Sequence, residues 1–216
     1  MSEVDAARRR HQQLGIPEDI SRETLSLFDH AIAISRWNRL RLTGELYQVG
    51  RLEVTPYRLL AHPEAGPLFW YDAAEIARLG PGFRRGDPAL GLHVPASEPL
   101  TPAMCDDSIH RIRTAFGGVF PGEPLRIATC TSWLLDEQLA EYLPADSNIV
   151  GFERRFNMVP GARDNDDAIL HAVFGPDRPT DIEALPRRTS LERAVVDHLR
   201  AGKHWRVRTG WIDIKS

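Results

Sequence analysis

The sequence predicts a mixed α+β protein, in which a sheet is flanked by helices. Apolar residues recur at helical spacing in the first 42 residues, and the period then changes to the alternation that is typical of strands. Helix-start signals and further strand patterns follow one another along the rest of the chain. This order of elements favours an α+β sheet protein over a β-sandwich or a helical bundle.

Residues 1–42 are expected to form an N-terminal helical segment, and residues 43–216 a second domain. Between Leu25 and Leu40 the apolar residues lie at roughly helical spacing, which predicts one helix over residues 21–42. Arginines gather near the end of this helix, where its dipole favours positive charge.

The remaining elements are expected as an irregular alternation of strands and helices. Strands are predicted over residues 45–54, 56–62, 66–72, 89–94, 125–135, 147–156, 168–174 and 204–214. Helices are predicted over residues 73–83, 101–116, 136–144 and 189–199. The clearest helix starts are Thr101, with Pro102 at the first helical position, and Thr189, which forms a capping box with Glu192.

The composition argues against several classes of protein. The 216 residues carry a formal net charge of -3, so no basic surplus points to nucleic acid. No apolar run approaches the roughly 20 residues of a membrane span, and no apolar core follows the N-terminal arginines, as a signal peptide requires. Cys105 and Cys130 suggest no disulfide framework, and the histidines lack metal-ligand spacing. We therefore expect a cytoplasmic protein without a metal ion.

The strand over residues 89–94 ends in a histidine. Side chains alternate along a strand, so Ala89, Gly91 and His93 share one face. Small side chains beside an imidazole leave room for a flat or long ligand to lie against the strand. The alternative is a structural role, in which a partly buried histidine forms a hydrogen bond to a backbone carbonyl. A titratable group points to function only when its pKa is perturbed and it lies in a cleft.

The loop after this strand leads into the helix that begins at Thr101. Pro95 ends the strand pairing, and the unsatisfied N–H groups of the helix start, together with the helix dipole, favour a phosphate. This arrangement predicts a site for a nucleotide-like cofactor.

The sequence CTSWLLDEQL, from Cys130 to Leu139, begins with a strand end that is more polar than a core strand requires. If this strand neighbours the strand of His93, Ser132 or Cys130 meets the imidazole. The alternative is a strand end whose hydroxyls satisfy their own backbone, with a buried and inert cysteine. Arg154 is interpreted either as a ligand for an acidic group or as part of a solvated strand edge.

Five segments together resemble a known family. They are LYQVGRLE, GDPALGLHVP, CTSWLLDEQLAEYLPADSNIVGFERRF, HAVFG and LPRRTSLERAVVDHLRAGKHWRVRTG, spread over residues 44–210. This combination resembles the bacterial acyltransferase-domain family with a GNAT-like C-terminal domain, where GNAT denotes the acyl-CoA-dependent N-acyltransferase fold. The resemblance implies a mixed, largely antiparallel sheet flanked by helices.

The resemblance also implies an activity, which is direct transfer of an acyl group from acyl-CoA to a small-molecule amine. Acyl-CoA would lie between the strands at residues 89–94 and 125–135. His93 would act as the general base, and Ser132 would protonate or orient the departing thiolate. The other implied residues are, for the donor, Val94, Ala96, Ser97, Leu100 and Thr101, and, for the substrate, Cys130, Trp133 and Arg154.

The expected diphosphate loop departs from the family's usual pattern, Gln/Arg-x-x-Gly-x-Gly/Ala. This chain has PASEPLTP, without glycine and with the acidic Glu98. Two alternatives therefore stay open: a non-catalytic GNAT-like domain that binds an acyl thioester or small ligand, and an acyltransferase whose donor is an acyl carrier protein. The arginines that would meet an acidic carrier are Arg84, Arg85, Arg111 and Arg113. The strand over residues 204–214 either closes its own sheet or adds to that of a second copy in a homodimer.

Overall fold

A computed structural model of the protein describes residues 2–27, 36–59, 73–80, 82–96 and 98–214. The chain divides into two compact units, unit 1 with residues 1–129 and 212–216, and unit 2 with residues 130–211. Strand pairing is mostly antiparallel and helices accompany the strands in both units. This confirms the predicted mixed α+β fold class.

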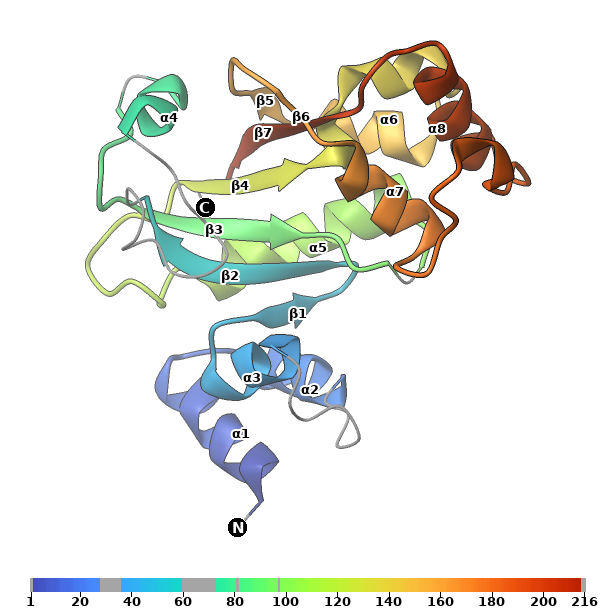
Figure 1. Ribbon diagram of the computed structural model, residues 1–216. Coiled ribbons are helices and arrows are strands. Elements are labelled where there is room, and N and C mark those ends of the chain that lie inside the picture. Colours follow the sequence, from blue (N-terminus) through green and yellow to red (C-terminus); the bar gives the residue numbers. More distant parts are fainter. Residues whose placement is uncertain (1, 28–35, 60–72, 81, 97, 215–216) are drawn as a thin grey trace. The chain divides into compact units, whose positions relative to one another are not determined.

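Unit 1 contains the N-terminal helices and a row of strands (Figure 1). Its elements are α1 (Glu3–Gln13), α2 (Glu18–Ser26), α3 (Arg36–Thr43), β1 (Tyr47–Val49), β2 (Leu52–Arg58), α4 (Ala73–Arg78), β3 (Pro88–His93), α5 (Pro102–Ala115) and the start of β4 (Ile127–Ser132). The strand order is β1-β2-β3-β4, in which the first two pairings are antiparallel and the pairing of β3 with β4 is parallel.

The core of unit 1 is built from the apolar faces of these strands and of α5. Leu46, Leu52 and Leu90 are fully buried, and the Tyr47 ring packs edge-on against Phe116 at a centroid distance of 5.5 Å. Helix α2 is anchored to the strands by a hydrogen bond, because the backbone N–H of Gln48 donates to Thr24 Oγ1 at 2.9 Å.

A tight hairpin joins β1 to β2, and it corrects the prediction of one strand over residues 45–54. Val49 pairs with Leu52, so the turn consists of Gly50 and Arg51. Gly50 has φ +58°, and a glycine with positive φ at the first turn position is what a type II′ hairpin requires. The alternating apolar pattern continues through this turn, which is why the sequence pattern alone joined the two strands.

The predicted helix over residues 21–42 is also wrong as a single element. Helix α2 ends with Leu27 as its C-cap, and α3 begins at Arg36. The intervening residues 28–35 and the strand predicted over residues 66–72 lie outside the described residues. Helical spacing persists across the break, so periodicity alone did not locate it.

Unit 2 contains short helices and a second group of strands. Its elements are the end of β4, η2 (Trp133–Leu135), η3 (Glu137–Glu141), α6 (Asn148–Glu153), β5 (Asn157–Met158), β6 (Arg163–Asp164), α7 (Asp166–Phe174), η4 (Ile182–Ala184), α8 (Ser190–Arg200) and most of β7 (Arg206–Asp213). Strand β7 pairs antiparallel with both β5 and β6 of its own chain.

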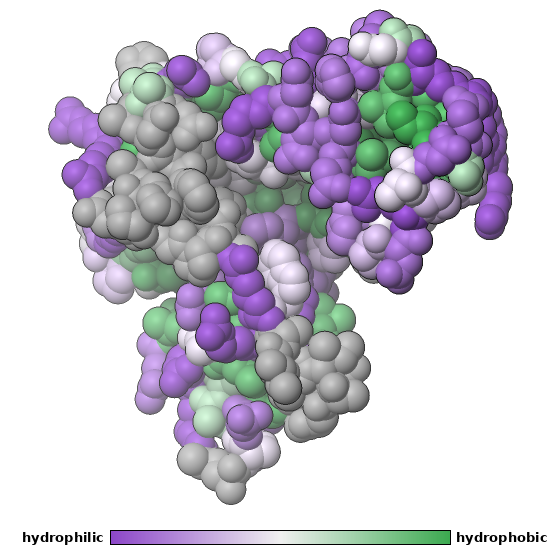
Figure 2. Space-filling model, in the orientation of Figure 1, coloured by the Kyte–Doolittle hydropathy of each residue, from purple (hydrophilic) through white to green (hydrophobic). Residues whose placement is uncertain are grey.

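The core of unit 2 is an apolar cluster that lies among its helices. Trp205, Ile169 and Val195 are fully buried in it, and the Trp205 indole N–H donates to the backbone carbonyl of Val195 at 3.3 Å. On the face drawn in Figure 2, hydrophobic surface of this unit shows between hydrophilic residues in the region of α6 and α8.

Two predicted strands of this region are helices. Within the strand predicted over residues 147–156, residues 148–153 form α6, which begins where Ser147 Oγ accepts a hydrogen bond from the Val150 N–H at 3.4 Å. Residues 168–174 belong to α7, which is capped by Asn165. Short apolar runs fit a strand or a helix equally well, and here the side-chain caps provide the local signal for a helix.

Other predicted elements are confirmed. Thr101 caps α5 with Pro102 at its first position, and Thr189 forms the predicted capping box with Glu192 at the start of α8. Strands β3 and β7 lie where the sequence placed them, and residues 137–141 form a short helix of the 3-10 type. Across the described ranges, every helix is too short or too polar to cross a bilayer.

Candidate functional site

A row of polar side chains crosses one face of the strands in unit 1. Glu53 of β2 lies directly opposite Gln48 of β1 on one side and His93 of β3 on the other. Directly opposite residues of antiparallel strands point to the same face. Gln48, Glu53 and His93 therefore form one continuous row, which is unusual in strands that are otherwise buried.

His93 lies at the end of this row and is largely removed from solvent. Its Nε2 atom is 3.3 Å from Thr55 Oγ1, and the ring packs edge-on against Trp37 of α3 at a centroid distance of 5.6 Å. Burial, and to a smaller extent the charge of Arg36, lowers the pKa of His93 to about 4. The imidazole is therefore neutral at pH 7 and has a lone pair with which to accept a proton.

Glu53, the central member of the row, is a buried carboxylate with a partly buried partner. Only 4% of Glu53 is exposed, and its side chain forms an ion pair with the guanidinium of Arg41 from α3. Arg41 also donates to Asn38 Oδ1 at 3.4 Å. A buried charge is tolerated only when it is paired, so this ion pair allows a carboxylate to lie beside His93.

The small residues of β3 accommodate a tyrosine from the neighbouring strand. Gly91 pairs with Thr55 of β2 and with Thr129 of β4, so these side chains share a face. The Tyr57 hydroxyl reaches across β3 and lies 2.7 Å from Thr129 Oγ1 in a buried hydrogen bond. Part of the room that the sequence predicted for a ligand over Ala89 and Gly91 is thus taken by Tyr57.

The loop after β3 and the start of α5 hold the residues that were predicted to bind the donor. Val94 is half-buried, Ala96 is exposed and Leu100 is buried, whereas Ser97 lies outside the described residues. Thr101 Oγ1 accepts a hydrogen bond from the third residue of the 14-residue helix α5. The N–H groups of the first turn of a helix have no partner within the helix, and α5 presents this turn next to the loop.

Arg51 connects the hairpin turn to this loop. Its backbone N–H donates to Ser108 Oγ of α5 at 2.8 Å, and its Nε donates to the backbone carbonyl of Glu98 at 2.9 Å. Only 6% of Arg51 is exposed. The loop that lacks glycine is therefore held by an arginine side chain from a different part of the chain.

A cavity of about 790 Å³ opens beside these groups. Its wall is formed by α2, α3, the β1–β2 hairpin, the loop after β3 and the first turns of α5, and includes Arg41, Gln48, Arg51, Glu53, Pro95 and Met104. The cavity therefore reaches Glu53, the strand partner of His93. Its volume lies within the range of pockets that hold small molecules.

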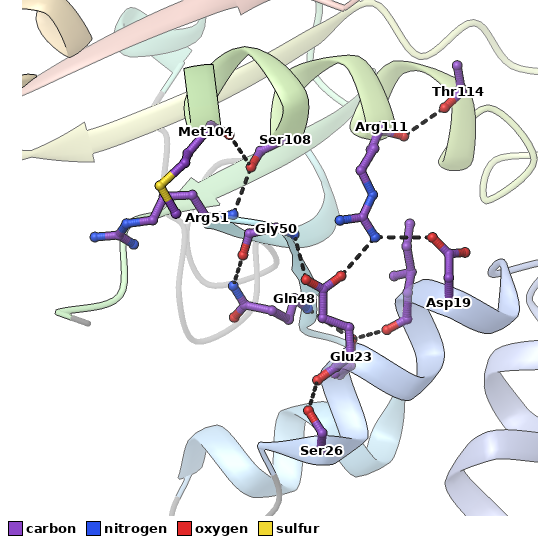
Figure 3. Close-up of polar contacts among 12 residues, drawn as sticks. Asp19, Glu23, Ser26, Gln48, Gly50, Arg51, Met104, Ser108, Arg111 and Thr114 are labelled. Carbon is purple, nitrogen blue, oxygen red and sulfur yellow. Dashed lines mark hydrogen bonds and ion pairs between the residues drawn. The ribbon is translucent and has the colours of Figure 1, made fainter. Parts of the chain in front are cut away.

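An ion-pair cluster fixes the geometry of this cavity (Figure 3). Arg111 of α5 bonds to Asp19 and Glu23 of α2, at 3.1 and 2.8 Å. Glu23 also accepts a hydrogen bond from the backbone N–H of Gly50 at 3.1 Å. Three separate elements, α2, the hairpin and α5, are thus tied together around the cavity.

The remaining candidates lie in unit 2. Burial raises the pKa of the Cys130 thiol to about 12, so this cysteine is protonated and not nucleophilic at neutral pH. Ser132 Oγ accepts a hydrogen bond from the Leu134 N–H at 3.1 Å, and Trp133 packs against the apolar cluster of the unit. Arg154 is exposed at the end of α6, not on a strand, and donates to the backbone carbonyl of Ala145.

Comparison with known proteins identifies the family. The family model described as GNAT-like C-terminal domain matches residues 46–212. This chain belongs to that family. The GNAT-like domain family was the resemblance expected from the sequence, which is thereby confirmed.

Solved structures of acyltransferases are similar to this member of the GNAT-like family. An acyltransferase in complex with decanoyl-CoA and teicoplanin is 35% identical, with a TM-score of 0.75, over 98% of this chain and 64% of that chain. An acyltransferase in complex with decanoyl-CoA is 36% identical, with a TM-score of 0.75, over 98% of this chain and 63% of that chain. This chain therefore spans less than two thirds of their length. No curated protein matches it.

Sequence reasoning missed several residues of this GNAT-like site. Gln48, Arg51, Glu53 and Arg41 were not singled out, although Glu53 stands between two apolar residues of a strand, which is a detectable signal. The part of the chain that the structure describes holds no group of three or more acidic, histidine or cysteine side chains arranged for a metal ion.

Proposed function

We propose that this chain is an acyl-CoA-dependent N-acyltransferase, with residues 43–216 as its GNAT-like domain. The observation that carries the proposal is the similarity, at 35% identity over 98% of this chain, to an acyltransferase in complex with decanoyl-CoA and teicoplanin. Membership of the GNAT-like family supports the same reaction class. The cosubstrate is acyl-CoA, and the acceptor is a small-molecule amine.

The acyl group is transferred directly. His93 takes a proton from the incoming amine, itself or through a water molecule, the new C–N bond forms, and the thioester C–S bond breaks. The support for this role is the position of His93 at the end of the polar row, opposite Glu53; its imidazole is neutral, and the lowered pKa makes it a weaker base than one that titrates near pH 7. Ser132 protonates or orients the departing thiolate, and a hydroxyl that gives up its proton regains one from water; the Ser132 oxygen accepts the Leu134 N–H.

The donor is held by the loop after β3 and the start of α5. Val94, Ala96, Leu100 and Thr101 bind its diphosphate, with the dipole of α5 supplying positive potential; Ser97, predicted with them, lies outside the described residues. The side chain of Glu98 is exposed at this loop and opposes an anion. Cys130, Trp133 and Arg154 contribute to the substrate side, with Cys130 as an uncharged wall.

The first test is calorimetric titration of the chain with acetyl-CoA and decanoyl-CoA. Binding should tighten in Glu98→Gly, and Glu98→Gln is the matched control that removes the charge without adding backbone freedom. Absence of binding by all forms would move the donor to a carrier protein or leave the non-catalytic alternative. Arg111 and Arg113, two of the arginines considered for a carrier, are already bonded to Glu23 and to the backbone carbonyl of Asp213.

The second test addresses His93 directly. His93→Ala should lower the rate of free thiol release by roughly 10²–10⁴-fold, the usual contribution of a positioned base, while donor binding is retained. A variant with unchanged turnover would remove His93 from the mechanism.

A further inference from the structure

Three polar atoms of residues that line the cavity of unit 1 are buried and have no hydrogen-bond partner. They are Arg41 Nε, Gln48 Oε1 and Arg51 Nη1, and all three residues line the cavity. A buried donor or acceptor without a partner costs free energy, so unsatisfied groups seldom gather at one place in a folded protein. All three atoms would be satisfied by a bound group that supplies two acceptors and at least one donor.

These side chains are held in place and do not turn to one another. Arg51 is fixed through Nε by the Glu98 carbonyl, and the amide of Gln48 is fixed because its Nε2 donates to the Gly50 carbonyl at 2.6 Å. Because Nε2 donates in that bond, Oε1 is the remaining polar atom of the Gln48 amide, and it can accept a hydrogen bond. In Figure 3 the Arg51 guanidinium and the Gln48 amide point away from the ion pairs of Arg111.

The charges at the cavity favour a cation. Glu53 is paired with Arg41, and Glu23 is paired with Arg111, which leaves Arg51 against the carboxylates of Glu98 and Asp107. Both of these carboxylates are exposed at the cavity wall. A protonated amine is attracted to these two carboxylates.

A secondary amide is the neutral group that satisfies these atoms. Its carbonyl oxygen accepts from Arg51 Nη1 or Arg41 Nε, and its N–H donates to Gln48 Oε1. Amines that carry amide groups add the positive charge that Glu98 and Asp107 favour. The wall also reaches Glu53, which lies opposite His93, so an amine bound here is on the same face as the proposed base.

We propose that this cavity binds the acceptor, and that the acceptor is a primary amine bearing secondary amides, recognised by Arg51 and Gln48. The identity of this ligand as an acceptor rests on the proposed function. Its binding to the cavity does not, and it is measured separately from turnover.

The test uses glycyl-glycyl-glycinamide as an amine with amides, and n-hexylamine as an amine without them. With the wild-type chain, bound tripeptide amide should slow hydrogen–deuterium exchange in peptides that cover residues 47–58 and 98–107. Hexylamine should leave exchange in these peptides unchanged. This measurement needs no variant and no acyl donor, so it does not depend on a substitution being tolerated.

A variant then assigns the contact. Arg51→Met removes the donor and the charge at similar side-chain length, and should weaken use of the tripeptide amide, as kcat/KM for thiol release, by about 10- to 100-fold, as expected for a hydrogen bond to a charged group. Because Arg51 also holds the loop of Glu98, the readout is the ratio of the two amines: the loss of kcat/KM with the tripeptide amide should exceed the loss with hexylamine by about this factor. Arg8→Met is the matched control, because Arg8 is a largely exposed arginine of α1, and it should behave as wild type with both amines.

The outcomes separate the two proposals. Protection of both peptides without any thiol release would support the cavity and refute the acyltransferase. Thiol release with no protection, or with equal losses for both amines in Arg51→Met, would overturn the cavity proposal and leave the reaction intact. Protection by pantetheine, which carries two amides and no phosphate, with none by the tripeptide amide would assign the cavity to the donor and overturn its role as acceptor site.

Discussion

The buried imidazole of His93 should make the stability of unit 1 depend on pH in a way that one substitution removes. The folded pKa of His93 is about 4, whereas the pKa of histidine in an unfolded chain is about 6.5. As the pH falls below 6.5, the unfolded chain therefore takes up a proton that the folded chain does not. Stability is fully present above about pH 6.5 and is lost progressively as the pH falls toward 4.

The size of this effect follows from the two pKa values. With a folded pKa of about 4 and an unfolded pKa of about 6.5, proton linkage lowers the free energy of unfolding by about 2 kcal/mol at pH 5 relative to pH 7. His93→Gln keeps a side chain that can bond to Thr55 but does not titrate. Between pH 7 and pH 5, the free energy of unfolding of the variant should therefore fall by about 2 kcal/mol less than that of the wild type.

The assay is urea denaturation of both forms at pH 7, 6 and 5, compared as differences so that other titrating groups cancel. His110→Gln, a substitution of an exposed histidine on α5, should retain the wild-type dependence. If His93→Gln showed the same loss as wild type, the imidazole would not be held neutral by burial.

Three further substitutions have expected outcomes. Glu53→Gln leaves the buried guanidinium of Arg41 without its counter-ion and should lower the free energy of unfolding by about 3–5 kcal/mol in urea titration, and strictly additive losses with Arg41→Met would contradict the ion pair. Gly50→Ala places a Cβ 2.8 Å from a serine hydroxyl of α5 at φ +58° and should cost at least about 1 kcal/mol, so an unchanged denaturation midpoint would refute the turn geometry. Thr189→Ala removes the cap of α8 and should lower stability by about 1 kcal/mol, whereas Thr180→Ala, at an exposed loop position, should not.

Part of the fold was readable from local signals. Thr101 with Pro102 and Thr189 with Glu192 were predicted as helix starts, and both caps are present. Such signals are reliable because a cap is a hydrogen bond between residues three apart, so its energy does not depend on the rest of the fold. Strand β7 was found for the same reason, since alternation is a property of the strand itself, whereas β3 was predicted as a short apolar run that follows a turn.

Local signals did not predict the type of the elements whose apolar periodicity fits both a strand and a helix. Residues 147–156 and 168–174 are short apolar runs, and they were interpreted as strands although they contain α6 and most of α7. Burial of one apolar face is compatible with either structure. The caps Ser147 and Asn165 favour the helix locally, and packing around Ile169 in the core of unit 2 completes it.

The sequence by itself determined the family, the fold class and the helix caps, because these depend on motifs and on contacts between near neighbours. Only the tertiary structure decided where His93 lies and what surrounds it. It also brought together Gln48, Arg51 and Glu53 with the start of α5, from positions about fifty residues apart along the chain. A cavity is defined by groups that chain folding places side by side, and no period or spacing in a sequence records which unsatisfied donor will face which acceptor.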